Sequence, residues 1–441
     1  MKTIINLFSL LGFMKIPSKH ARSLGAMLSE PLHKNAVYLM INTLGTSALG
    51  FVFWIIVYRH YVPEDVGLAV SLISTIILLA VFSTLGLNIG LVRFLPESKM
   101  QDTTSLINTS LTVGALSSLL FAVIFILGTD LWTPELTIIK EHGIFILLFL
   151  IFTVTQTISL LIASVFVARR QAKWVFINDT LLSGCTKLFL IFLFLELKEV
   201  GIVSAWGISI AIGAIVSLSI ILPRLYETYR PIVKIKLSGI REMLRFSMLN
   251  YICDILNRMP MLLMPLIIIN LLSPSYAAYF YTPWLFASLL YAIPLSICTS
   301  LLAEGATDRE NLSKSLKKAV KFLIIILLPA IPMIWILGYY LLLIFGQVYA
   351  TNTLPLLRIF VIAVIPYSAN VIFITLERIE KRMNLVILMY AIIATTTIGL
   401  SYLLIQKVGI IGIGWSWLIA HTIAQSVILF LKGKKFYSYF K

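Results

Sequence analysis

The sequence is poor in charged residues and in the side chains from which most catalytic sites are built. Only 12% of its 441 residues are Asp, Glu, Lys or Arg, whereas 59% are hydrophobic, more than a water-soluble fold could bury. The three cysteines lie far apart within apolar stretches, which excludes a disulfide framework or a zinc pattern. The five histidines lack metal-ligand spacing, and no phosphate-binding loop for ATP occurs. We therefore predict no metal, no cofactor and no enzymatic activity.

Long apolar stretches are what the sequence has in abundance. A bilayer core about 30 Å thick requires about 20 apolar residues per spanning helix, and helices are favoured because backbone groups in lipid must bond within their own segment. The short alternating strands of a membrane barrel do not occur. We predict an all-α polytopic membrane protein whose twelve transmembrane helices span residues 35–58, 66–92, 104–128, 143–168, 174–195, 200–222, 243–271, 276–302, 318–343, 355–376, 384–405 and 410–431.

Positive charge is distributed unevenly among the connectors between these helices. Alternate connectors, together with the two termini, carry 28 of the 35 Lys and Arg residues. The remaining connectors hold only Arg59, Lys140, Lys198 and Lys407. Because an excess of Lys and Arg marks the cytoplasmic side, we predict a multi-pass cell-membrane protein with both termini in the cytoplasm. The net charge of +16 then reflects this bias and does not indicate nucleic acid as a partner.

The second half of the sequence repeats the first. Predicted helices one to six and seven to twelve begin at positions that differ by about 210 residues, the signature of an internal repeat. The turn at Pro63 recurs at Pro274, and Val200-Gly201-Ile202 recurs as Val408-Gly409-Ile410. Any twelve evenly spaced helices would give similar offsets, but the matching turns favour duplication. We predict two six-helix lobes related by a pseudo-twofold axis along the membrane normal.

This repeat sets the predicted domain layout. Residues 35–222 form the N-lobe and residues 241–431 the C-lobe, joined by a cytoplasmic linker at 223–240. Residues 1–34 form a cytoplasmic arm whose apolar start is too short to span the bilayer. We expect it to lie on the membrane surface as an interfacial helix. Residues 432–441 form a basic cytoplasmic tail.

Ionisable residues at bilayer depth are costly and therefore mark candidate sites. Arg258 is the deepest, about 22 Å from the cytoplasmic end of its helix at 1.5 Å per residue. Asp254 precedes it by one turn, so the two can pair on one face. Such a pair can line a cavity for a ligand, or it can be a self-neutralised pair packed within the bundle. Pro260 and Pro265 follow, and prolines free backbone groups of a helix.

The fifth predicted helix carries Lys187 near its middle and Asp179 two turns earlier. Lys187 has no carboxylate three or four residues away, so its charge needs a partner from elsewhere. An anionic ligand would serve, but so would snorkelling or an acid on another helix. Arg358, near the outer end of the tenth helix, is better explained by contact with the outer headgroups.

The first two predicted helices are unusually polar for membrane helices. Asn42 lies among hydroxyl residues in the first, and Asn88 lies among glycines near the end of the second, which Arg93 closes. Small and amide residues allow close helix packing, which is the simpler explanation. The functional alternative is a polar cavity lining with Arg93 at its inner mouth. The candidate substrate-binding set is therefore Arg258, Lys187, Asp254, Arg93, Asn42, Asn88 and Asp179.

Several segments together resemble a known group of membrane proteins. They are the run from Asn35-Ala36-Val37-Tyr38 through Gly45 and Phe51 to Tyr61-Val62-Pro63-Glu64-Asp65-Val66-Gly67-Leu68-Ala69, the helix exit Gly86-Leu87…Arg93-Phe94-Leu95-Pro96-Glu97, and the positions Gly201, Trp206, Gly409, Gly412 and Trp415. With its tandem halves, the chain over residues 34–432 resembles the polysaccharide-biosynthesis branch of the multidrug/oligosaccharidyl-lipid/polysaccharide exporter superfamily. The resemblance implies alternating access between two lobes around a cationic cavity, which suits Arg258 and Lys187.

The same resemblance implies a function, the flipping of a polyprenyl-pyrophosphate-linked oligosaccharide across the membrane. Membrane lipids and a polysaccharide polymerase or glycosyltransferases would be further partners. Arg and Lys in a water-filled cavity can neutralise a pyrophosphate through charge-assisted hydrogen bonds. One alternative is a multidrug or cation exporter of the same superfamily, whose cavity should favour carboxylates, whereas the ionisable residues at bilayer depth are three basic and two acidic ones. Another is a non-transporting scaffold of a polysaccharide-assembly complex.

Overall fold

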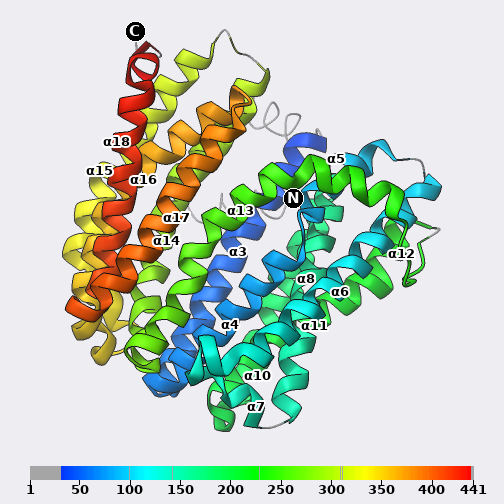
Figure 1. The fold of residues 1–441 in the computed structure, drawn as a ribbon, viewed down its shortest axis with the longest axis horizontal. Coiled ribbons are helices and arrows are strands. Elements are labelled where there is room, and N and C mark those ends of the chain that lie inside the picture. Colours follow the sequence, from blue (N-terminus) through cyan, green and yellow to red (C-terminus); the bar gives the residue numbers. More distant parts are fainter. Residues whose placement is uncertain are drawn as a thin grey trace, which may run out of the picture.

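The described part of the chain is almost entirely helical (Figure 1). The structure is a computed structural model that describes residues 31–98, 100–141, 143–227, 229–307, 309 and 311–438. Within these residues, 12 helices are long and apolar enough to cross a membrane, and no strand occurs. The predicted all-α polytopic membrane fold is thus confirmed. The interfacial helix expected within residues 1–34 lies almost wholly outside the described residues.

Six spans belong to each half of the chain. The first half contains α3 (Pro31–His60), α4 (Pro63–Ser83), α5 (Leu87–Phe94), η1 (Leu95–Glu97), α6 (Met100–Trp132), η2 (Pro134–Leu136), α7 (Ile138–Glu141), α8 (Gly143–Ala168), α9 (Ala172–Val175), η3 (Phe176–Gly184), α10 (Cys185–Leu193), η4 (Leu195–Leu197), α11 (Lys198–Val216), η5 (Ser217–Ile221) and α12 (Leu222–Leu225). The second half contains α13 (Leu237–Leu271), α14 (Pro274–Thr307), α15 (Leu312–Leu343), α16 (Gln347–Ile379), α17 (Met383–Val408) and α18 (Ile411–Ser438).

The two halves pack their helices in the same pattern. In the first half, α3 packs against the fifth span (α9, η3 and α10), and in the second half α13 packs against α17. Likewise α8 lies against α6 and α11, as α16 lies against α15 and α18. Prolines Pro63 and Pro274 begin the equivalent helices α4 and α14. These helices therefore have the neighbours that their predicted repeats have, as expected for a two-lobed duplication.

Helix interruptions occur in the first half, although prolines concentrate in the second. Prolines lie inside α13, α14, α15 and α16 without ending them. The second span, predicted as one helix over 66–92, is split between α4 and α5, where φ is 50° at Leu85 and 79° at Gly86. Glycine takes such a left-handed conformation at little cost. The fifth span contains the π-helical segment η3, and the sixth contains the π-helical segment η5.

The break in the second span is stabilised by side-chain hydrogen bonds to carbonyl groups at the end of α4. Tyr251 OH on α13 donates to Phe82 O at 2.6 Å, and Ser117 Oγ on α6 donates to Ser83 O at 2.7 Å. A Cβ at Gly86 would lie 3.0 Å from Tyr251 Cβ. Because buried carbonyl groups require partners, the break depends on tertiary contacts, and one of these comes from the other lobe.

The lobes meet tightly at one end of the molecule, the outer seam, formed by the end of α3 and the start of α4 against α14 and the α15–α16 turn. Tyr58 OH donates to Ala278 O at 3.2 Å, and Arg59 Nε donates to Ile344 O at 2.8 Å. A Cβ at Gly67 would lie only 1.7 Å from Pro274 O. From this seam the two groups of helices diverge in Figure 1 toward the end that carries α5 and the end of α18.

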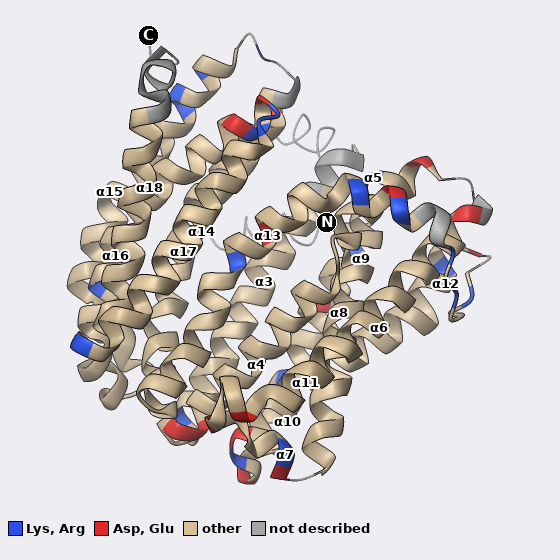
Figure 2. Cartoon of the chain, viewed as in Figure 1, with Lys and Arg blue, Asp and Glu red and all other residues tan. Residues whose placement is uncertain are grey.

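Charged residues gather at the two ends of the bundle, and few lie between (Figure 2). The end opposite the outer seam carries the connectors rich in Lys and Arg, so we call it the basic end.

Candidate functional site

Arg258 and Asp254 form an ion pair near the middle of α13. Arg258 Nε donates to Asp254 Oδ1 at 2.7 Å, as their i,i+4 spacing predicts. The Arg258 side chain is 49% exposed and the Asp254 side chain is 26% exposed. This hydrogen bond uses only Nε, so among the described residues the two terminal amino groups of the guanidinium stay available to a ligand. Half of the Arg258 side chain is thus left uncovered by the described residues, although it lies in the middle of an apolar span.

This pair points toward the opposite lobe. Tyr251 lies seven residues before Arg258, which is about two helical turns, so the two residues and Asp254 share one face of α13. Tyr251 OH reaches Phe82 O in the N-lobe, which fixes that face as the one directed at α4 and α5. Figure 2 shows both charge colours in the middle of α13, the helix that packs against α4 and α5 of the N-lobe. The geometry places the ion pair at the boundary between the lobes.

Asp179 lies within the N-lobe in a network of amide and hydroxyl groups. Asn178 Nδ2 donates to Asp179 Oδ1 at 3.0 Å, and Asn178 Oδ1 accepts from Ser217 Oγ at 2.9 Å. Thr180 Oγ1 donates to Asn42 Oδ1 on α3 at 2.9 Å. Two of the predicted residues, Asn42 and Asp179, therefore belong to one network, which joins the first, fifth and sixth spans.

Lys187 shares a cavity of about 220 Å³ with Asp179. The cavity lies between α8, the fifth span and α11, and Gln156, Ser159, Ser183 and Ser209 add polar groups to its wall. Lys187 Nζ lies 5.7 Å from the ring centre of Phe53 on α3. Lys187 forms no ion pair with any carboxylate among the described residues. The ammonium group therefore keeps its charge unmatched by a direct acidic partner.

The π-helical segment explains how Asp179 and Lys187 line one cavity. In an α-helix of 3.6 residues per turn, residues eight apart differ by about 80° around the axis. The wider turns of η3 follow i→i+5 hydrogen bonds and rotate Asp179 back toward the face of Lys187. Such π segments are frequent at functional sites. The sequence gives no local signal for this widening, so Gln156, Ser183 and Ser209 were not predicted as site residues.

Arg93 and Asn88 lie apart from both clusters, in α5 at the basic end. Arg93 pairs with Glu97 one turn later, and both side chains are more than half exposed. Asn88 Oδ1 is buried without a hydrogen-bond partner. Arg258 and Lys187 likewise belong to different lobes and to different polar clusters. The seven predicted residues thus form three groups: the α13 pair, the N-lobe cavity and the end of α5.

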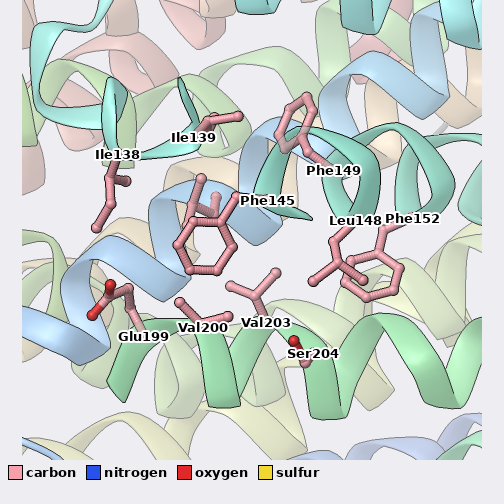
Figure 3. A pocket seen from close by; sticks show the side chains of 11 residues that line it. Ile138, Ile139, Phe145, Leu148, Phe149, Phe152, Glu199, Val200, Val203 and Ser204 are labelled. Carbon is pink, nitrogen blue, oxygen red and sulfur yellow. The ribbon is translucent and has the colours of Figure 1, made fainter. Parts of the chain in front are cut away.

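A second, smaller cavity contributes little to the site. It lies between α4, α7, α8 and α11 near the outer seam, measures about 40 Å³, and is lined mainly by aliphatic and aromatic side chains. Figure 3 shows Phe145, Phe149 and Phe152 around it, with Glu199 at its edge. We interpret it as a packing void.

The family to which the chain belongs follows from a family-model comparison. The model described as "Polysaccharide biosynthesis protein" matches residues 32–304. The chain belongs to this family. Among curated proteins, none matches.

Solved structures share the fold at low sequence identity. The lipid II flippase MurJ in an inward closed conformation is 15% identical with a TM-score of 0.73, over 89% of this chain and 87% of that chain. An inward-facing multidrug resistance MATE family transporter of the MOP superfamily is 14% identical with a TM-score of 0.70, over 92% and 98%. An outward-facing MATE transporter is 15% identical with a TM-score of 0.61, over 92% and 96%. These similarities confirm the predicted fold.

Proposed function

We propose that this protein flips a polyprenyl-pyrophosphate-linked oligosaccharide from the cytoplasmic to the outer leaflet by alternating access. The observation that supports this most is the half-exposed Arg258–Asp254 pair at the boundary between the lobes. A pyrophosphate cannot cross hydrocarbon unsolvated, because isolated charge is strongly disfavoured there. A guanidinium offers a planar pair of donors that matches phosphate oxygens, and the membership in a polysaccharide biosynthesis family supports a glycan cargo.

Asp254 allows the site to release the cargo. Arg258 Nε is held by Asp254, so the guanidinium is oriented and its charge is partly compensated. An oriented guanidinium binds phosphate with less loss of side-chain freedom, whereas the compensated charge prevents retention that would stop the cycle. Lys187 supplies a second cation from the N-lobe cavity. Because that cavity is separate from the α13 pair, the contribution of Lys187 to flipping can be tested independently of Arg258.

The basic end is the cytoplasmic end in this proposal, because Lys and Arg excess marks that side. Both termini then lie in the cytoplasm of a cell-membrane protein, and the outer seam is closed toward the outside. The lobes at residues 35–222 and 241–431 move against each other, and the lipid tail of the cargo stays in the bilayer. Glycosyltransferases would deliver the cargo and a polymerase would receive it.

Orientation is tested by cysteine labelling with an impermeant thiol reagent in intact cells. A cysteine at Glu135, which is exposed in the turn after α6, should react from outside, and one at Lys236 should react only after permeabilisation. Glu199 is a poor probe position because it is only 6% exposed. The reverse pattern of labelling would overturn the orientation.

The cargo class is tested in proteoliposomes with two probes. One probe is a fluorescent polyprenyl-pyrophosphate-linked disaccharide, and the other is ethidium, which a cation exporter would carry. We expect the native chain to flip the pyrophosphate probe and leave ethidium transport at the background of empty liposomes. Arg258→Ala should reduce flipping at least 100-fold, about 2.7 kcal/mol at 1.36 kcal/mol per tenfold, because one charge-assisted contact is lost. Ethidium transport without flipping would favour the multidrug alternative, and neither activity would favour the scaffold.

A further inference from the structure

The connection between the lobes is held against the N-lobe. Tyr226 and Tyr229, which follow α12, are 1% and 0% exposed, and both join the core cluster formed by α5, α6 and α8. Arg169 Nε at the end of α8 donates to Tyr226 OH at 3.1 Å, and the Arg169 guanidinium carbon lies 4.8 Å from the centre of that ring. Two buried phenols thus fix the start of the segment.

The residues after Tyr229 form neither helix nor strand and lie along α6. Asn108 Nδ2 donates to Arg230 O at 2.7 Å, while the backbone N–H groups of Lys234 and Lys236 each donate to a threonine of α6, at 3.3 Å. Lys236 also pairs with Asp102 at 3.1 Å. These contacts define residues 229–236 as a strap that belongs structurally to the N-lobe.

The outer face of the strap is apolar, although the segment lies at the basic end. Ile232, Val233 and Ile235 are 60%, 85% and 51% exposed. Figure 1 shows the segment between α12 and α13 at the edge of the N-lobe that faces away from the C-lobe. In water such exposure of consecutive aliphatic side chains would be unfavourable, so this face requires an apolar neighbour.

The depth of the strap identifies that neighbour as lipid. With 33 residues, α6 is about 50 Å long at 1.5 Å per residue, whereas the hydrocarbon core is about 30 Å thick. If α6 extends equally beyond both sides, hydrocarbon begins about 10 Å from its start. The threonines that bind the strap, Thr109 and Thr112, lie about 14 and 18 Å from that start. The strap therefore runs where acyl chains meet headgroups.

Positive charge accompanies these aliphatic side chains. Arg224, Arg230 and Lys234 are exposed beside them, and Glu227 is the one acidic residue among the described residues of the segment 223–236. Lys236 is already paired with Asp102. Basic clusters next to a membrane attract anionic lipids, and aliphatic side chains beside them enter the acyl region.

We propose that residues 229–236 form an amphipathic strap that binds anionic phospholipid headgroups of the cytoplasmic leaflet and secures the N-lobe in that leaflet. Ile232, Val233 and Ile235 enter the acyl region, and Arg230 and Lys234 contact lipid phosphates. This proposal stands on the strap contacts and does not depend on the cargo.

The test uses the full chain in vesicles of brominated lipids, with a fluorophore at Val233→Cys. Cys253 and Cys298 are buried and Cys185 is exposed, so Cys185→Ser leaves one accessible thiol. Competition between brominated phosphatidylglycerol and brominated phosphatidylcholine gives their relative binding constant at the strap. We expect strong quenching and a preference for phosphatidylglycerol of at least fivefold, since one cation near an anionic surface contributes about that factor.

Matched variants distinguish binding of lipid headgroups by the strap from a general attraction between the basic protein and anionic lipid. Arg230→Gln with Lys234→Gln should lower the preference to near one and keep the quenching. Lys317→Gln with Lys318→Gln removes the same charge from exposed positions on α15 and should leave the preference unchanged. A fluorophore at Leu127, 74% exposed on α6, should be quenched equally by both lipids. An unquenched strap, equal affinity for both lipids, or a preference that survives the glutamines would each overturn the proposal.

Discussion

The two lobes share one packing pattern but place their polar groups differently. The N-lobe encloses a polar cavity between α8, the fifth span and α11, with Asp179 and Lys187 on its wall. In the C-lobe, the equivalent helices α16 and α18 pack around aromatic side chains. Trp417 Nε1 donates to Tyr291 OH at 3.0 Å, and Asn370 Nδ2 lies 3.0 Å from His421 Nδ1. The charged pair of the C-lobe lies instead on the boundary face of α13. Duplication preserved the fold, while each copy acquired a different polar role.

A difference in helix regularity accompanies this difference in polarity. The N-lobe contains the break at Leu85–Gly86 and the π-helical segments η3 and η5, whereas α17 and α18, which repeat the fifth and sixth spans, are regular. A polar cavity and non-regular backbone occur together because freed backbone groups need polar neighbours. Among the described residues, irregular backbone and the polar cavity thus occur together in the N-lobe.

The strongest test of how the lobes join is a methyl group at the outer seam. A Cβ at Gly67 would lie 1.7 Å from Pro274 O and 2.4 Å from Pro274 C, and backbone atoms cannot yield as a side chain can. Gly67→Ala should lower the free energy of unfolding by about 3 kcal/mol through overpacking. Thermal unfolding measures this loss. Gly399→Ala, where nothing lies within 4 Å of the new Cβ, is the control, and equal stability of the two variants would refute a closed seam.

Replacing Lys187 should show that its charge lowers the stability of the folded protein. A lone cation at bilayer depth costs about 2.5–3.5 kcal/mol, and Lys187 has no direct carboxylate partner among the described residues. Lys187→Met should therefore stabilise the protein by about 2 kcal/mol and reduce flipping about tenfold. Lys407→Met, at an exposed position on α17, should change neither. A Lys187→Met protein that is less stable would mean that the ammonium has a structural partner.

A smaller effect is expected where the break in the second span meets α13. Tyr251→Phe removes the hydrogen bond to Phe82 O, which is 2.6 Å long and contributes about 1 kcal/mol. Amide hydrogen exchange of residues 81–86 should then accelerate about fivefold, because 1 kcal/mol corresponds to that factor. Tyr340→Phe, 68% exposed on α15, should leave this exchange unchanged. Unchanged exchange in Tyr251→Phe would show that the bond does not hold the break.

Helix positions and the lobe repeat were predictable because they depend on local properties. Apolar length decides where a helix crosses the bilayer, so each predicted span overlaps an observed one. The differences are the split of the second span at Leu85–Gly86 and extensions such as that of α16, which begins at Gln347 rather than at 355. The Arg258–Asp254 pair was predictable from i,i+4 spacing alone. Pro260 and Pro265 free backbone groups of α13, yet the helix continues through both, because neighbouring groups can satisfy what a proline frees in a membrane helix.

The interior of the N-lobe was not predictable in the same way. The break at Leu85–Gly86 depends on Tyr251 and Ser117, which are distant in the sequence. The π-helical turns of η3 bring Asp179 and Lys187 to one cavity. An α-helix of 3.6 residues per turn would place the two side chains on different faces. The strap was predicted only as a linker, because its attachment requires Asn108, Thr109 and Thr112 of α6.

The central claim is that Arg258 binds the cargo and does not serve only as one partner of a structural ion pair. The decisive measurement compares Arg258→Ala with the double variant Arg258→Leu/Asp254→Leu, in both protein level and flipping of the pyrophosphate probe. Removing one partner of a purely structural pair leaves an uncompensated charge that destabilises the fold, and the apolar double variant would restore both quantities. We expect instead that Arg258→Ala accumulates normally and that neither variant flips the probe. Restored flipping in the double variant would contradict the account.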